Sequence, residues 1–143
     1  MTRHYPDDAS IGRLARGMIG RTLPKAEWTH AAHFASALWL LRHEPEPAER
    51  MPGLIRAYNQ ATGVENTDTA GYHETITQAS LRAAAALLAA HPDHPLHEVV
   101  DALMDGPLGR SDWLLAHWSR ERLFSVEARR GWLDPDLEPL PYP

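Results

Sequence analysis

Apolar residues recur at helical spacing along most of the chain. Between Asp8 and Gly20, the apolar side chains lie at positions i, i+3, i+4, i+7 and i+8 and would form one face: Ile11, Leu14, Ala15, Met18 and Ile19. No segment alternates apolar and polar residues for long enough to predict a strand. The pattern therefore predicts an all-α protein.

Prolines, glycines and short polar residues divide the chain into helices. Proline is tolerated in a first helical turn, so Pro24 and Pro47 mark two helix starts, and Gly63 suits a helix end. Asp68 or Thr69 is expected to cap the following helix. The expected helices span residues 8–20, 24–44, 47–63, 70–90 and 96–104, followed by a short helix that Ser111 caps and that carries Trp113, Leu114 and Trp118, and by further turns begun by Ser119 or Ser125.

The C-terminal residues 134–143 are rich in proline and cannot be helical. We expect them to lie extended across the helices. With 143 residues, the chain is long enough to bury one core. The prediction is a compact single domain, residues 1–143, of five to seven helices with an extended tail packed on it.

Composition narrows the possible functions. A net charge of −5 argues against a nucleic-acid partner, which favours a basic surface. The absence of cysteine excludes disulfides, thiolate catalysis and iron–sulfur clusters, and no glycine-rich loop suggests a nucleotide. Haem is not expected either. No apolar stretch is long enough for a signal peptide or a membrane span, so we expect a cytoplasmic protein that binds a small molecule.

Histidine and glutamate lie among the apolar residues of the helix expected over 24–44. Phe34 and Leu38 fall within about 80° of His30 on a helical projection, so His30 is central to the apolar face. Glu27 lies about 60° away on the same face, and His33 lies about 60° to the other side. Trp28 and Trp39 point the opposite way, and such an apolar patch would allow a homodimer.

The helix after residue 70 repeats this arrangement around His73. Ile76 and Leu81 lie within about 80° of it, Thr77 and Ser80 share its side, and Glu74 is at the edge. On the 47–63 helix, Asn59 lies near the buried direction. Buried polar groups need partners, so we expect these groups to meet in one pocket between the first turns of two helices and the end of the third.

Three functions fit such a pocket. In the first, Glu27, His30 and His73 bind one divalent metal (iron, manganese or zinc), with His33 as an alternative third ligand. Asn59, Thr77 or Tyr58 would then orient the imidazoles. In the second, His30 and His73 act as acid and base without metal, in a lyase, isomerase or cyclase. In the third, the same groups only join the helices or bind a ligand without catalysis.

Our first hypothesis is a small-molecule enzyme assisted by one metal ion. Our second hypothesis is a non-catalytic helical module that binds a ligand or partner. The candidate catalytic residues are His30, His73, Glu27 and Glu74. The candidate substrate-binding residues are Tyr58, Asn59, Tyr72, Thr77 and Arg129, the last because its guanidinium could reach a carboxylate.

Three segments together resemble a family of small, uncharacterised, all-helical bacterial proteins with the pattern W-T-H-x-x-H … Y-N … G-Y-H-E-T-x-T. Here the segments run from Trp28 to His33, from Tyr58 to Asn59 and from Gly71 to Thr77. The resemblance covers the chain from about Pro24 to the tail. It implies no activity, but it includes Trp28, His30, Tyr58, Asn59, Tyr72, His73, Glu74 and Thr77 in the pattern.

The spacing Glu27-x-x-His30 also resembles one motif of the ferritin-like di-iron bundles. Those proteins use two such motifs and two further inward glutamates. This chain offers one motif, because Thr77 stands three residues after Glu74 where a histidine would be needed. A mononuclear site fits the sequence better than a di-iron site.

Overall fold

The computed structural model describes residues 3–143 and confirms the all-α prediction. Within that range there are seven α-helices, three 3-10 helices and no strand. The α-helices are α1 (Asp8–Ile19), α2 (His30–His43), α3 (Pro47–Ala61), α4 (Glu74–Ala90), α5 (Leu96–Asp105), α6 (Arg120–Leu123) and α7 (Val126–Arg130). The 3-10 helices are η1 (Lys25–Glu27), η2 (Pro107–Gly109) and η3 (Trp113–Ala116). None of the helices in residues 3–143 is long and apolar enough to cross a membrane.

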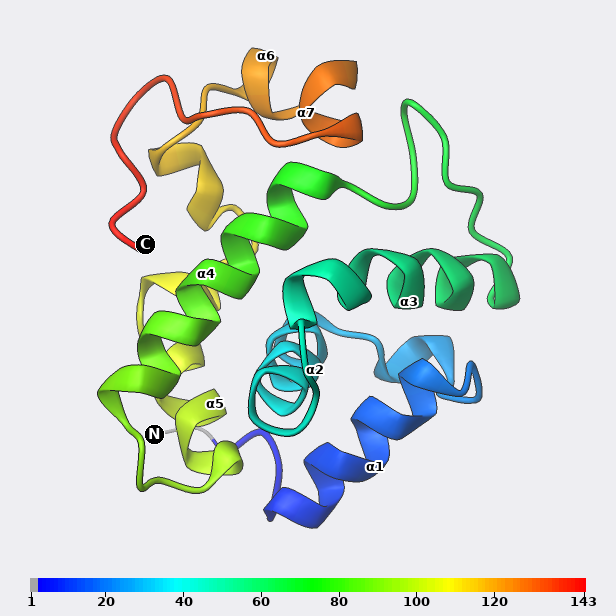
Figure 1. Cartoon of the computed structure of the whole chain (residues 1–143), viewed down its shortest axis with the longest axis vertical. Helices are drawn as coiled ribbons and strands as arrows, with labels where there is room; N and C mark the ends of the chain where they lie inside the picture. Colours follow the sequence, from blue (N-terminus) through cyan, green and yellow to red (C-terminus); the bar gives the residue numbers. More distant parts are fainter. Residues whose placement is uncertain (1–2) are drawn as a thin grey trace.

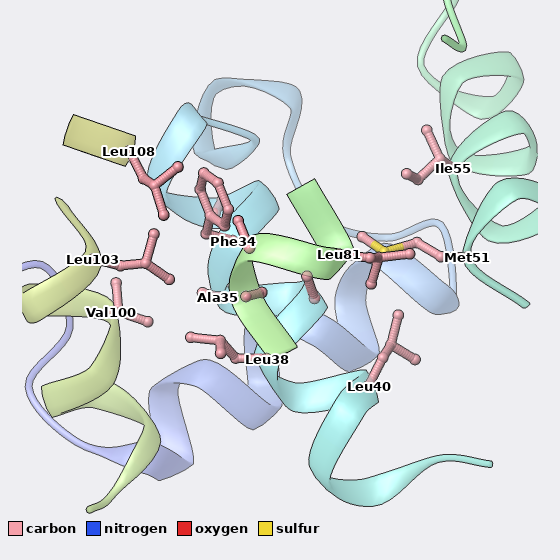
Figure 2. Packing of buried hydrophobic residues seen from close by; sticks show 14 of the residues in the cluster. Phe34, Ala35, Leu38, Leu40, Met51, Ile55, Leu81, Val100, Leu103 and Leu108 are labelled. Carbon is pink, nitrogen blue, oxygen red and sulfur yellow. The ribbon is translucent and has the colours of Figure 1, made fainter. Parts of the chain in front are cut away.

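Helix α2 is the central element of the fold. It contacts α1, α3, α4 and α5, which surround it in Figure 1, while α6 and α7 lie at the N-terminal end of α4. Phe34, Leu38 and Leu40 of α2 are almost fully buried. Side chains of α3, α4 and α5 converge on them in Figure 2. Alanines 32, 35 and 37 of α2 are also buried, and their small side chains allow close approach of the neighbouring helices.

Side-chain caps fix where several helices begin. Asp7 accepts a hydrogen bond from the Ser10 amide at the start of α1 (2.8 Å). Ser119 and Ser125 do the same for α6 and α7, as predicted. Ser111, in contrast, does not cap a helix: Asp112 precedes η3 without a side-chain bond, and Trp118 follows the end of η3.

Helix α2 begins at His30, so the predicted start at Pro24 was wrong. Pro24 begins only the 3-10 turn η1. The backbone of Trp28 then leaves helical geometry (φ −85°, ψ 68°), and the Thr29 hydroxyl accepts a hydrogen bond from the Ala32 amide (3.2 Å). This cap satisfies an otherwise free amide at the first turn of α2. Glu27 consequently does not lie on the same helix as His30.

Helix α4 begins later than predicted because neither Asp68 nor Thr69 caps it. Asp68 instead forms a two-pronged ion pair with Arg130 (2.7 and 2.8 Å). The cap is His73, whose Nδ1 accepts a hydrogen bond from the Ile76 amide (3.2 Å). His73 is therefore at the helix N-terminus and not on a helical face.

The tail after Asp134 packs on the domain without forming a helix, as predicted. The Leu137 amide donates to the His117 carbonyl (2.9 Å). Further along, the Tyr142 ring meets Trp113 edge-on, with ring centres 6.5 Å apart. The tail thus covers the outer side of η3.

Candidate functional site

A cavity of about 90 Å³ lies between α2, α3, α4 and the segment that contains η3. Its polar lining consists of His30 and His33 from α2, Thr77 and Ser80 from α4, and Ser111. Its apolar walls come from Phe34, Ala37, Met51, Ile55, Ile76, Leu81, Trp113 and Leu114. This cavity lies beside the first turns of α2 and α4, where the sequence placed a pocket. Helix α3 contributes Met51 from near its start and Ile55 from its middle, so the prediction that the end of this helix lines the pocket was wrong.

His30 is the first residue of α2, and its ring is held by one hydrogen bond. Nε2 lies 2.7 Å from the carbonyl oxygen of Leu108 in η2. A carbonyl oxygen can only accept, so Nε2 must carry the proton. In the neutral imidazole this leaves a lone pair on Nδ1, which has no hydrogen-bond partner in the described chain and is not sealed from solvent. His30 thus presents a free basic nitrogen while lining the cavity.

His33 lies one turn further along α2 and lines the same cavity. The Trp28 indole stacks on its imidazole, with ring centres 3.9 Å apart and planes inclined by 29°. Crowding by protein atoms and the nearby His30 lower the pKa of His33, to about 4. The residue nevertheless keeps an exposed surface, so solvent screens much of this shift. At neutral pH His33 is an uncharged imidazole.

Three hydroxyl groups complete the polar lining. The Thr77 hydroxyl donates to the carbonyl of His73 (2.8 Å), so only its oxygen lone pairs remain available. The Ser80 and Ser111 hydroxyls have no hydrogen-bond partner within residues 3–143 and can donate to a ligand. Thr77 and Ser80 thus form the inward polar ladder that the sequence predicted for α4.

His73 does not line this cavity, because both of its ring nitrogens serve the fold. Nδ1 caps α4, and Nε2 donates to the Leu123 carbonyl at the end of α6 (2.6 Å). The residue is buried, and burial lowers the pKa of its imidazole. His73 could not bind a metal or move a proton without giving up one of these bonds. Its contacts here are structural.

Glu27 is also separate from the cavity. It is exposed at the end of η1 and lines a different depression, together with Tyr5 and Arg13. The structure therefore does not bring together the predicted metal ligands Glu27, His30 and His73. Within residues 3–143, no group of three or more His, Cys, Asp or Glu side chains is placed to hold a metal ion. Binding of a divalent metal therefore stays a prediction, and the positions of Glu27, His30 and His73 do not fit it.

Glu74 and Tyr72 pair with each other at the start of α4. The Tyr72 hydroxyl donates to a Glu74 carboxylate oxygen. Burial, with a further contribution from Glu74, raises the pKa of Tyr72, so the phenol stays protonated. Neither residue lines the cavity.

The remaining predicted substrate-binding residues support the chain around the cavity. The Tyr58 hydroxyl donates to the Leu23 carbonyl (2.8 Å), and the Asn59 amide donates to Asn66 (3.0 Å). Arg129 donates through Nη1 to the carbonyls of Gly71 and Tyr72 (3.1 and 3.2 Å). The Tyr58 bond joins α3 to the segment between α1 and η1, and the bonds of Asn59 and Arg129 fix the loop between α3 and α4. None of the three side chains lines the cavity.

The sequence did not lead us to assign two members of the lining, Ser111 and Trp113, to the pocket. Trp113 had the signature of a core aromatic and is indeed 7% exposed, but its ring also forms a cavity wall. Ser111 was interpreted as a helix cap. A cavity wall made by a short 3-10 helix has no periodic pattern that would distinguish it from the core.

The chain matches no family model, no curated protein and no solved structure. The resemblance to small helical bacterial proteins consequently stays a prediction.

Proposed function

We propose that the cavity binds a small organic molecule and that His30 transfers a proton to or from it through Nδ1. The Leu108 carbonyl holds the proton on Nε2 of His30, and so leaves an unpaired basic nitrogen on a side chain that lines the cavity. Imidazole is the side chain whose proton exchange is best suited to neutral pH.

The surrounding groups suit removal of a proton from a carbon next to a carbonyl group. Nδ1 of His30 would accept the proton, and the hydrogen bond from Nε2 to Leu108 strengthens as the ring becomes cationic. The hydroxyls of Ser80 and Ser111 would donate to the oxygen on which negative charge develops. Return of the proton to a neighbouring atom would complete an isomerisation, and loss of a leaving group would complete an elimination.

His33, not His73, is the second imidazole of the cavity, and it lies one turn from His30 on the same helix. Because the ring of His33 is uncharged at neutral pH, it would not supply the proton that is returned. His30 is cationic once it has taken the proton, so it would return that proton through the same Nδ1 and become neutral again. One imidazole would thus serve as base and then as acid, where the sequence proposed the pair His30 and His73.

The test is exchange of carbon-bound protons in heavy water. Small ketones and hydroxyketones are incubated with the protein, and loss of the α-proton signals is followed by NMR. We expect exchange to be faster with the wild type than with His30→Gln, because general-base catalysis typically contributes on the order of 100-fold or more. The glutamine keeps an N–H donor for the Leu108 carbonyl but has no basic nitrogen.

Equal exchange rates for the wild type and His30→Gln, across the whole series, would contradict the proposal. Serine 36 provides a matched control, because it is buried in the same helix and does not line the cavity. Ser36→Ala should therefore exchange these protons as fast as the wild type.

Non-catalytic ligand binding is the second candidate. It is favoured by the structural role of His73, since the chain then holds one acid–base histidine fewer than predicted. A compound that shifts the NMR signals of the cavity residues without any proton exchange would support this alternative.

A further inference from the structure

The lining of the cavity carries no fixed charge. No Lys, Arg, Asp or Glu in the described chain lines it. Glu74 accepts a hydrogen bond from the Tyr72 hydroxyl, and Arg129 donates to two backbone carbonyls. Either side chain would have to break these bonds to turn toward a ligand. A charge placed among these groups would meet no opposite charge, and the apolar walls would remove part of its hydration at a cost. The surroundings thus select against carboxylates and ammonium groups.

The polar groups of the lining divide into donors and acceptors. Ser80 and Ser111 have hydroxyl protons that no group of residues 3–143 accepts. His30 offers the lone pair of Nδ1, and the Thr77 oxygen offers lone pairs because its proton is already donated to the His73 carbonyl. A ligand that satisfies both kinds of group needs an acceptor oxygen and, close to it, a polar or acidic hydrogen.

The rest of the lining is apolar and the space is small. The apolar walls of the cavity include Phe34, Met51, Ile76 and Trp113, which come from four different helices. The cavity volume of about 90 Å³ is several times the roughly 10–15 Å³ that such a cavity needs to hold one water molecule. The cavity therefore has room for a small organic molecule whose carbon atoms contact the apolar walls.

From these observations we infer that the ligand of this cavity is a small uncharged carbonyl compound, a ketone or an amide with a short alkyl group. Its carbonyl oxygen accepts from Ser80 and Ser111, and its N–H or α-C–H faces Nδ1 of His30. The alkyl group contacts the apolar walls. This inference rests on the proposed function and adds the substrate class.

The experiment compares three probes of similar size and different charge: propanamide, propanoate and butylammonium. Binding is measured by the NMR shifts of the Trp113 indole, the Ile76 and Thr77 methyls and the His30 ring. We expect propanamide to bind at least about tenfold more tightly than either ion, which corresponds to a difference of about 1.4 kcal/mol. Ser80→Ala and Ser111→Ala should each weaken propanamide binding by a few-fold to about tenfold, because each removes one hydrogen bond. Ser36→Ala should leave it unchanged.

An ion that binds as tightly as propanamide, or more tightly, would overturn the inference about the ligand and leave proton transfer by His30 in place. Failure of all three probes to shift these signals would overturn it too, and the ketone exchange assay would then decide the proposed function separately. Weakening by Ser36→Ala equal to that by Ser80→Ala would show an effect through folding and would also contradict the inference.

Discussion

His30 and Leu108 are 78 residues apart in the sequence, and Nε2 of His30 donates to the Leu108 carbonyl over 2.7 Å. The bond joins the first turn of α2 to the 3-10 turn η2. The acceptor of this bond is a backbone atom. Which nitrogen of the imidazole carries the proton therefore depends on the path of the chain at residues 107–109 and not on a neighbouring side chain. Backbone geometry thus sets which nitrogen of His30 is basic.

The first prediction concerns this protonation state. Two-bond proton–nitrogen NMR spectra distinguish the two neutral forms of a histidine ring. We expect His30 to carry its proton on Nε2 at neutral pH, because the carbonyl can only accept. Addition of propanamide should then shift the Nδ1 resonance of His30.

His73 provides the internal comparison for that measurement. Its Nε2 also donates to a carbonyl, that of Leu123, but its Nδ1 already accepts from the Ile76 amide. Its Nδ1 resonance should therefore not respond to the same ligand. A His30 ring protonated on Nδ1 would contradict the assignment of the basic nitrogen.

The second prediction concerns Gly109, which fixes the turn that carries the Leu108 carbonyl. A methyl group at this position would overlap the Met104 carbonyl, so the backbone has to move to accept alanine. We expect Gly109→Ala to lower the free energy of unfolding by about 1–3 kcal/mol and to disturb the His30 ring signals.

Gly53→Ala is the matched control, because nothing lies within 4 Å of the added methyl group there. It should be neutral or slightly stabilising, since alanine is favoured in a helix. Chemical denaturation of both variants measures the difference. Equal stability for Gly109→Ala and the wild type would show that the turn adapts freely.

Apolar periodicity predicted which faces of the helices are buried. His30 and Phe34 of α2, and Thr77 and Ser80 of α4, all line the predicted pocket. Those residues lie within helices, where a spacing of 3.6 residues per turn fixes the face on which a side chain lies. The sequence therefore predicted these side chains of α2 and α4, but not that α3 contributes Met51 from near its start and Ile55 from its middle.

The residues just outside the helices could not be predicted in this way. The projection placed Glu27 and His73 on helical faces, but Thr29 and His73 itself cap the two helices. A cap residue has a non-helical backbone, so the direction of its side chain does not follow the helical projection. Histidine is not among the preferred capping residues, so no sequence rule would have identified His73 as a cap.

The third prediction separates the two bonds of His73. His73→Ala removes both, and we expect a loss of about 1–3 kcal/mol in the free energy of unfolding. His73→Asn keeps a short side-chain acceptor for the Ile76 amide but cannot reach the Leu123 carbonyl, so its loss should be smaller. Equal losses would mean that the cap contributes nothing. Neither variant should alter proton exchange beyond the change that its lower stability causes.

The fourth prediction also concerns His73 and is about how the stability of the protein depends on pH. Burial lowers the pKa of folded His73 below its ordinary value of 6.5, while the unfolded chain keeps that value. As the pH falls below about 6.5, the unfolded state therefore binds a proton that the folded state excludes, and stability decreases. Above that pH the contribution of His73 to stability is complete.

His73→Asn should lose this part of the pH dependence. The free energy of unfolding, measured from pH 7.5 to pH 5, should fall less steeply for the variant than for the wild type. Other groups that titrate in this range are common to both proteins and cancel in the comparison. Parallel curves would contradict a lowered pKa for His73.

The fifth prediction concerns Tyr142, whose ring contacts Trp113 edge-on and does not itself line the cavity. Tyr142→Ala removes the edge-on ring contact. We expect this to lower the free energy of unfolding by about 0.5–1.5 kcal/mol, in addition to the loss from the apolar area that is no longer buried. With less support, Trp113 should sample more orientations, so propanamide binding should weaken and the indole resonance should broaden. Leu137→Ala is the control within the same tail, because Leu137 is 55% exposed. If Tyr142→Ala weakens neither stability nor binding relative to Leu137→Ala, the tail does not support the cavity wall, and η3 must hold Trp113 through its own packing.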